Sequence, residues 1–250
     1  MSSHLVTYLL RLADDNLILG QRLGALVSWM PDLEEDIAVA NVGLDHIGQA
    51  RHLFAYAAEV EGAGRTEDDL AMLRDERAFF NSVLVEQPDL DFAHTMARQL
   101  FVDAYQVPLY RALSASTDPT LAGIAQKALK EADYHLRRSA TWVVRLGDGT
   151  EESHRRMQDA ITEMWKYVDD LFVTDEVETD LAASGVAPDL AAVRAEFDTT
   201  VAQVLSEATM TLPDDPYQRT GGRTGYHTEH LGHLLPEMQS LYRAHEGAAW

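Results

Sequence analysis

The chain has no cysteine, few basic residues and no long apolar run. Without cysteine it forms no disulfide bond and no thiolate metal site. Only 20 lysines and arginines stand against 41 aspartates and glutamates, and the resulting net charge of -21 repels a phosphate backbone. No stretch reaches the ~18 apolar residues of a membrane helix, and no secretory signal begins the chain. We therefore expect a cytoplasmic protein with no nucleic-acid or membrane partner.

Proline and glycine are also scarce, at 8 and 15 residues among 250, and no strand-like alternation extends beyond a few residues. Leucines at three-to-four spacing instead predict an all-α protein. Breaks at Pro, Gly and capping residues divide the pattern into helices. The predicted helices cover residues 3–29, 32–61, 66–80, 91–115, 120–146, 150–172, 189–209 and 227–244. No linker interrupts them, so we expect one domain over residues 1–250.

The four longest predicted helices form two antiparallel hairpins, residues 3–61 and 91–146. Two stacked helical hairpins joined by a crossover make a ferritin-like bundle, and residues 66–80 would belong to that crossover. The sequence therefore predicts a ferritin-like four-helix bundle with additional C-terminal helices. A helical bundle of another topology is the alternative.

Each of the four long helices carries one acidic or amide side chain among its apolar positions: Asn16, Asp45, Asp103 and Glu131. A di-metal carboxylate bundle uses one carboxylate from each of two helices and a Glu-x-x-His pair from each of the other two. Here the positions three after Asp45 and Glu131 hold Gly48 and Tyr134. We therefore expect both imidazole ligands to be missing and Asn16 to replace one carboxylate.

These substitutions predict a vestigial di-iron site at which this chain binds no cofactor, because hard oxygen donors alone are too few for two irons. His135 is one residue past the motif position and should point about 100° away. Charged side chains would then neutralise the buried carboxylates. The candidates are Lys127, Arg51, His52 and His135. The alternative is an independent di-metal oxidase with an unusual site formed by Asp45, Asp103, Glu131 and His135.

Near the C-terminus, a glycine-rich loop at residues 221–225 precedes three histidines at positions 227, 230 and 233. The loop can hold a phosphate, such as that of coenzyme A, or let Arg223 reach a carboxylate of a partner protein. Histidines at this spacing can bind a metal weakly, but a protein interface is favoured. We therefore predict partner contacts by Arg223, His227 and His230.

Several blocks along the chain resemble the C subunits of the bacterial phenylacetyl-CoA epoxidases. The blocks are residues 17–23 (LILGQRL), 33–38 (LEEDIA), 45–51 (DHIGQAR), 84–88 (LVEQP), 91–95 (DFAHT), 127–136 (KALKEADYHL), 142–153 (WVVRLGDGTEES) and 225–232 (GYHTEHLG). They extend over nearly the whole chain, and several are long enough to be specific.

The resemblance implies a role in a multicomponent monooxygenase of phenylacetate catabolism. Such a complex inserts one oxygen atom into the ring of phenylacetyl-CoA to give a 1,2-epoxide. Its electrons come from NADPH through a flavin and iron-sulfur reductase subunit. The C subunit is a non-catalytic companion that assembles with and stabilises a homologous, iron-bearing ferritin-like subunit. By this resemblance our chain has no catalytic residue, the di-iron lies in the partner, and a homodimer is a further expectation. A stand-alone helical adaptor is the remaining alternative.

Overall fold

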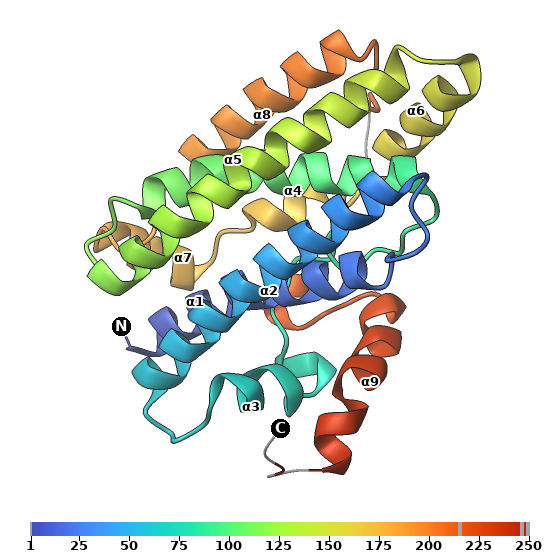
Figure 1. Ribbon diagram of the computed structural model, residues 1–250. Helices are drawn as coiled ribbons and strands as arrows, with labels where there is room; N and C mark the ends of the chain where they lie inside the picture. The colour runs from blue at the N-terminus through green and yellow to red at the C-terminus, as the bar shows by residue number, and fades with distance from the viewer. Residues whose placement is uncertain (1, 215–216, 246–247, 249–250) are drawn as a thin grey trace.

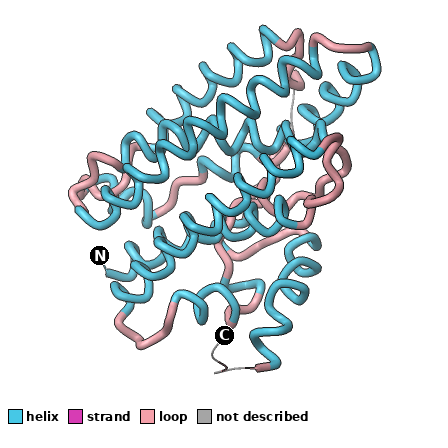
Figure 2. Tube along the Cα trace, in the orientation of Figure 1, coloured by secondary structure: helices cyan, strands magenta, loops and turns pink. Residues whose placement is uncertain are grey.

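The computed structural model describes residues 2–214, 217–245 and 248, and all regular elements within these ranges are helices (Figure 2). The four long helices are α1 (Ser2–Gly24), α2 (Leu33–Glu61), α4 (Phe92–Leu113) and α5 (Pro119–Gly147). The shorter ones are α3 (Glu67–Met72), α6 (Glu151–Trp165), α7 (Glu176–Ala183), α8 (Leu190–Glu207) and α9 (Glu229–Ala244). Three 3-10 turns complete the set: η1 (Glu76–Ala78), η2 (Val168–Phe172) and η3 (Gly222–Thr224). The predicted all-α class is confirmed.

The two long hairpins lie against each other as a ferritin-like bundle (Figure 1). The first hairpin is α1 with α2, and the second is α4 with α5, while α5 also contacts α2. Helices α6 and α8 pack on the second hairpin, and α3 and α9 lie beside the first (Figure 1). The extra helices therefore cover the outside of the bundle and leave its centre to α1, α2, α4 and α5. None of the described helices is long and apolar enough to cross a membrane.

Local capping explains where the bundle helices begin and end. The Asp32 side chain accepts a hydrogen bond from the Glu35 backbone N–H at the start of α2, where the sequence predicts a helix from residue 32. Gly62, in the left-handed region with φ 65°, ends the same helix. At the start of α4 the Asp91 side chain accepts from the His94 N–H.

The observed helices differ from the predicted ones at four places. The helix predicted over 3–29 ends at Gly24. The segment predicted as one helix over 66–80 is divided after Met72, because the Arg74 side chain turns inward and is buried against Asp14 of α1. The helix predicted to reach residue 172 gives way after Trp165 to the turn η2. Helix α7 was not predicted. It is capped by Asp175 and held through Glu178, whose carboxylate lies 2.5 Å from Arg11.

Three buried charged side chains on α1 form ion pairs with segments outside the four-helix bundle. These segments are the connection between α3 and η1, helix α7 and the turn η3. Asp14 pairs with Arg74, and Arg11 pairs with Glu178 of α7. Asp15 accepts two hydrogen bonds from Arg223, at 3.0 and 2.8 Å. All three are at most 4% exposed. Helix α1 therefore has polar contacts on its outer side as well as in the bundle centre, and each outer charge is compensated by a partner distant in sequence.

Candidate functional site: the polar centre of the bundle

A group of buried polar side chains occupies the middle of the bundle, where a ferritin-like protein holds its metals. This polar centre, contributed by all four long helices, consists of Asn16, His46, Gln49, Asp103, Gln106, Tyr110, His135 and Ser139. Each of these residues is at most 4% exposed. Their hydrogen bonds must therefore come mainly from one another.

Asn16 connects three side chains of the other helices. Its Nδ2 donates to the Leu12 carbonyl at 2.8 Å and to the Tyr110 hydroxyl at 2.9 Å. A carbonyl oxygen can only accept, so the Asn16 atom that faces the Leu12 carbonyl must be the amide nitrogen. The Asn16 Oδ1 then accepts from the Nδ1 of His46 at 2.8 Å and from Gln106 at 3.3 Å.

The network continues from Tyr110 to the edge of the bundle. The Tyr110 hydroxyl donates to Gln49 Oε1 at 3.1 Å, and Gln49 Nε2 donates to Glu131 Oε2 at 2.9 Å. A chain of hydrogen bonds thus runs from α1 through α4 and α2 to α5. Such a chain positions the helices relative to one another without any bound group.

We expect Tyr110→Phe to lower the free energy of unfolding by about 1–3 kcal/mol, because it leaves the buried Gln49 Oε1 without its donor. Tyr242→Phe is the matched control, since that hydroxyl bonds Asp69 at the surface of the protein, and stability should hardly change. Urea denaturation of both variants measures the difference. Equal losses would show that the buried network contributes nothing specific.

Two histidines and an aspartate converge beside this network. The ring centroids of His46 and His135 lie 5.1 Å apart, and one ligand atom from each of His46, Asp103 and His135 lies within 4.8 Å of the other two. Asp103 Oδ2 accepts from the Ser139 hydroxyl at 2.7 Å, and His135 Nε2 lies 3.1 Å from Asp45 Oδ2. In these three residues, one buried atom each has no hydrogen-bond partner among the described residues: His46 Nε2, Asp103 Oδ1 and His135 Nδ1.

Burial shifts the protonation of this group. It raises the pKa of Asp103 to about 6, against the opposing effect of nearby His135. Burial likewise lowers the pKa of His46 well below its ordinary value, and His135 adds to the effect. His46 is therefore a neutral imidazole near pH 7, with one ring nitrogen bearing a proton and the other a lone pair.

The predicted motif positions were wrong by one residue. Tyr134 is 50% exposed, and a Cβ added to Gly48 would meet only open space, so neither occupies an inward position. Asp45 and Glu131 are half-buried, at the edge of the polar centre. His135, predicted to point away, is fully buried and faces His46. The physical reason is the 100° turn per residue, which moves a side chain from edge to centre in one step.

The inward i, i+3 pairs are instead His46 with Gln49 on α2 and Ala132 with His135 on α5. In the Glu-x-x-His pattern, His46 and Ala132 thus stand where the two glutamates would be, and Gln49 replaces one histidine. Sequence reasoning missed five residues of the polar centre: His46, Gln49, Gln106, Tyr110 and Ser139. The signal that could have found His46 and Gln49 is the apolar stripe of α2, which passes through Val39, Val42 and Leu53.

The inward residues do not fit a di-iron centre. Such a site in a ferritin-like bundle takes carboxylates from four helices and two histidines. The polar centre offers one fully buried carboxylate, Asp103, with Asn16 and Gln49 as amides and Ala132 without any donor. Two metal ions would therefore lack the bridging and charge-balancing ligands that they require.

Of the four residues predicted to neutralise the carboxylates, only His135 makes such a contact, with Asp45. The prediction for the other three was wrong because their side chains are exposed. Arg51 lies 3.5 Å from Glu67, and Lys127 Nζ lies 3.4 Å from His52 Nε2. Amide and imidazole side chains fill the centre instead of lysine and arginine side chains.

The predicted partner contacts near the C-terminus are mostly inside the protein. Arg223 is buried on Asp15, and His227 lies between Glu86 Oε2 and the Phe79 carbonyl, both at 2.9 Å. The prediction was therefore wrong for Arg223 and His227. His230 is half-buried, and a contact by it stays a prediction.

The His227 contacts imply a stability that depends on pH. Burial opposes the charge of the ring, but the Glu86 carboxylate and the Phe79 carbonyl together raise the pKa of His227 above its ordinary value. A raised folded-state pKa stabilises the protein fully below the unfolded pKa, and that stabilisation is lost as pH rises through the folded one. The stability advantage over His227→Gln should therefore shrink as the pH rises from about 6.5, the ordinary histidine value, through the raised folded-state pKa. Urea denaturation across this range measures it, and an advantage that grows with pH would contradict the assignment.

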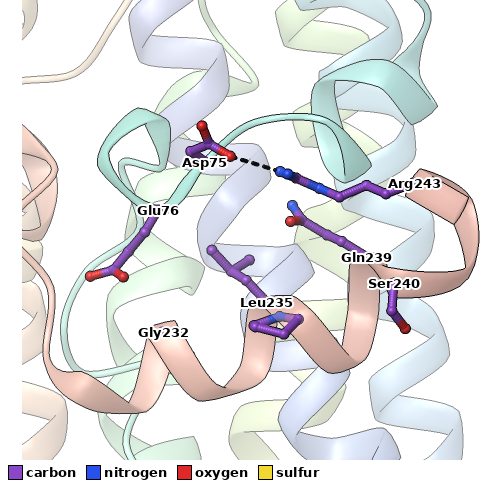
Figure 3. A pocket seen from close by; sticks show the side chains of 8 residues that line it. Asp75, Glu76, Gly232, Leu235, Gln239, Ser240 and Arg243 are labelled. Carbon is purple, nitrogen blue, oxygen red and sulfur yellow. Dashed lines mark hydrogen bonds and ion pairs between the residues drawn. The ribbon is translucent and has the colours of Figure 1, made fainter.

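A pocket of about 360 Å³ lies elsewhere, between the η1 region and α9 (Figure 3). Arg243 reaches Asp75 across it at 3.0 Å (Figure 3). Gln239 donates to the carbonyls of Ala71 and Arg74. None of its lining residues belongs to the four bundle helices. It therefore offers no access to the polar centre.

Comparison with known proteins agrees with this fold. The family model described as phenylacetic acid catabolic protein matches residues 1–250. The chain belongs to this family. A relative from Escherichia coli (strain K12), the C subunit of 1,2-phenylacetyl-CoA epoxidase, is 49% identical over 248 residues. The match covers 99% of this chain and 100% of that protein. The resemblance drawn from the sequence blocks is confirmed, and the family supports a role in phenylacetate catabolism.

Proposed function

We propose that this chain is a non-catalytic structural subunit of a multicomponent phenylacetyl-CoA 1,2-epoxidase. One observation carries the proposal: the inward positions of a ferritin-like bundle hold a single carboxylate, Asp103, where two irons would require several. The redox centre would then belong to a homologous, di-iron subunit that this chain binds and stabilises. The E. coli relative is named as one subunit of its epoxidase, which supports a complex of several chains.

The hydrogen-bond network supports the structural part of the proposal. In a metal-bearing bundle the ligands tie the helices together. Here Asn16, Tyr110 and Gln49 make equivalent ties with neutral groups. Hydrogen bonds thus join the helices where metal ligands would otherwise do so. A subunit whose role is to support another chain requires a stable bundle but no redox centre.

An exposed apolar stripe supports the assembly part. Leu33, Ile37 and Leu44 of α2 are 68, 54 and 67% exposed, and Trp29 just before the helix is 81% exposed. The three α2 positions fall within about 40° of one another around the helix. A partner surface would remove this apolar area from water, and the occupant we propose is the homologous ferritin-like subunit.

Co-expression with the iron-bearing and reductase subunits tests the function. We expect phenylacetyl-CoA-dependent NADPH consumption with all subunits and little when this chain is omitted. We expect none when this chain and the reductase are the only subunits present. Turnover by that last combination would instead support the independent oxidase, which requires Asp45 and Glu131 as ligands. Full turnover without this chain would refute the structural role.

A further inference from the structure

We propose that His46, Asp103 and His135 form a binding site for a single divalent transition-metal ion. The site lies in the polar centre and joins α2, α4 and α5. It goes beyond the proposed function, which concerns the absence of a di-iron centre and does not require any metal in this chain.

The hydrogen bond of His46 leaves a lone pair on its inner nitrogen. Asn16 Oδ1 can only accept, so the proton of the neutral His46 ring is on Nδ1. His46 Nε2 is then an acceptor, it is buried, and no described residue donates to it. An imidazole whose outer N–H is held by an amide or carboxylate oxygen is the usual arrangement of a metal-bound histidine.

His135 repeats this arrangement with a carboxylate. Its Nε2 lies 3.1 Å from Asp45 Oδ2, and a carboxylate accepts, so Nε2 bears the proton. His135 Nδ1 is the buried atom left without a partner among the described residues. Asp45, which the sequence suggested as a ligand, thus acts on the ring as an outer hydrogen-bond acceptor.

Asp103 completes the set from α4, which forms the second hairpin with α5. Its Oδ2 is occupied by the Ser139 hydroxyl at 2.7 Å, whereas its Oδ1 is buried and has no partner in the described part of the chain. Each of the three residues therefore has one atom held by a neighbour and one buried acceptor atom to which no described residue donates. Three acceptors without a donor repel one another unless a cation or a shared proton lies among them.

The spacing of the ligand atoms suits one metal ion, and the surrounding residues provide too few ligands for a second. A tetrahedral ion with ligands at about 2.1 Å separates them by about 3.4 Å. One ring nitrogen of each histidine and one carboxylate oxygen of Asp103 lie within 4.8 Å of one another, so small side-chain rotations can bring three ligand atoms to this spacing. Two imidazoles with one carboxylate are a donor set typical of Zn²⁺ and Fe²⁺, with a further position for water. The amides and Ala132 around the trio provide no ligands for a second ion.

Metal titration of the full chain tests the site. The chain is stripped with a chelator and titrated anaerobically with Co²⁺, whose visible absorption reports its ligands, and Zn²⁺ is then added in competition. We expect one ion per chain. Asp103→Asn and His135→Gln should each weaken binding at least about 100-fold, and Asp45→Asn about 10–100-fold through the outer hydrogen bond. His52→Gln, an exposed histidine of the same helix as His46, is the matched control and should bind as the wild type does.

A thermal melt of each variant with and without Zn²⁺ separates lost binding from lost folding. The wild type and His52→Gln should melt at a higher temperature with Zn²⁺, while folded Asp103→Asn should not respond. No Co²⁺ uptake by the folded wild type would overturn the site and would leave the three acceptors sharing a proton. Uptake that Asp103→Asn leaves unchanged would also overturn it, because the ion would be bound elsewhere. Two ions per chain would overturn the proposed function instead, so the two failures are distinguishable.

Discussion

Replacing Arg223 with methionine should lower the free energy of unfolding by about 3–5 kcal/mol, because it leaves the Asp15 carboxylate buried without its cation. The Arg223 guanidinium donates twice to Asp15 and also donates to the Phe80 carbonyl. Both ionic side chains are at most 6% exposed. Urea denaturation monitored by circular dichroism measures the change.

Two further variants make this result specific. Arg111→Met removes an ion pair of similar length, 2.6 Å to Glu196, in which both side chains are more than half exposed. Its cost should be about 0–1 kcal/mol because water screens the pair. Adding Asp15→Asn to Arg223→Met should recover part of the loss, since the unpaired charge is gone. If Arg223→Met cost no more than Arg111→Met, the buried pair would not fasten η3 to α1.

Substituting Ile37 and Leu44 together with lysine should weaken binding to the iron-bearing subunit about 100-fold or more, which corresponds to about 2.7 kcal/mol. Both side chains lie on the exposed apolar stripe of α2, so the isolated chain should keep its helical content and melting temperature. Affinity is measured by surface plasmon resonance with the purified partner. Leu241→Lys is the control, because Leu241 is 60% exposed on α9, outside the stripe. Equal losses for the two changes would show that the stripe is not the contact.

Much of the fold could be predicted because its determinants are local. Asp32 begins α2 and Gly62 ends it through contacts within a few residues, and leucine spacing marks the long helices. The outer segments could not be predicted in this way. Helix α7 depends on Arg11 for its anchor, and the break after Met72 depends on Asp14. Both partners lie on α1, far in sequence from the segments that they hold. The spacing of apolar residues within a segment does not indicate such distant contacts.

The sequence predicted that polar residues lie in the centre of the bundle, but it identified only some of these residues correctly. The sequence correctly indicated Asn16 and Asp103 as buried polar positions on the bundle helices. On α2 and α5 the sequence indicated Asp45 and Glu131 as inward positions, but the side chains that point inward are those of the next residues, His46 and Ala132. On a helix, a half-buried position at the edge of the bundle can be the immediate neighbour of a fully buried one. The sequence alone does not show which of the two faces the centre, so an acidic residue at the edge is easily taken for a metal ligand.

Iron reconstitution tests whether the middle of this bundle can hold a di-iron centre. The purified full chain is loaded anaerobically with ferrous iron, exposed to oxygen, desalted and analysed for iron per chain and by Mössbauer spectroscopy. We predict at most one iron per chain and no signal from a coupled pair. Two irons per chain with a coupled diferric signal would contradict the account.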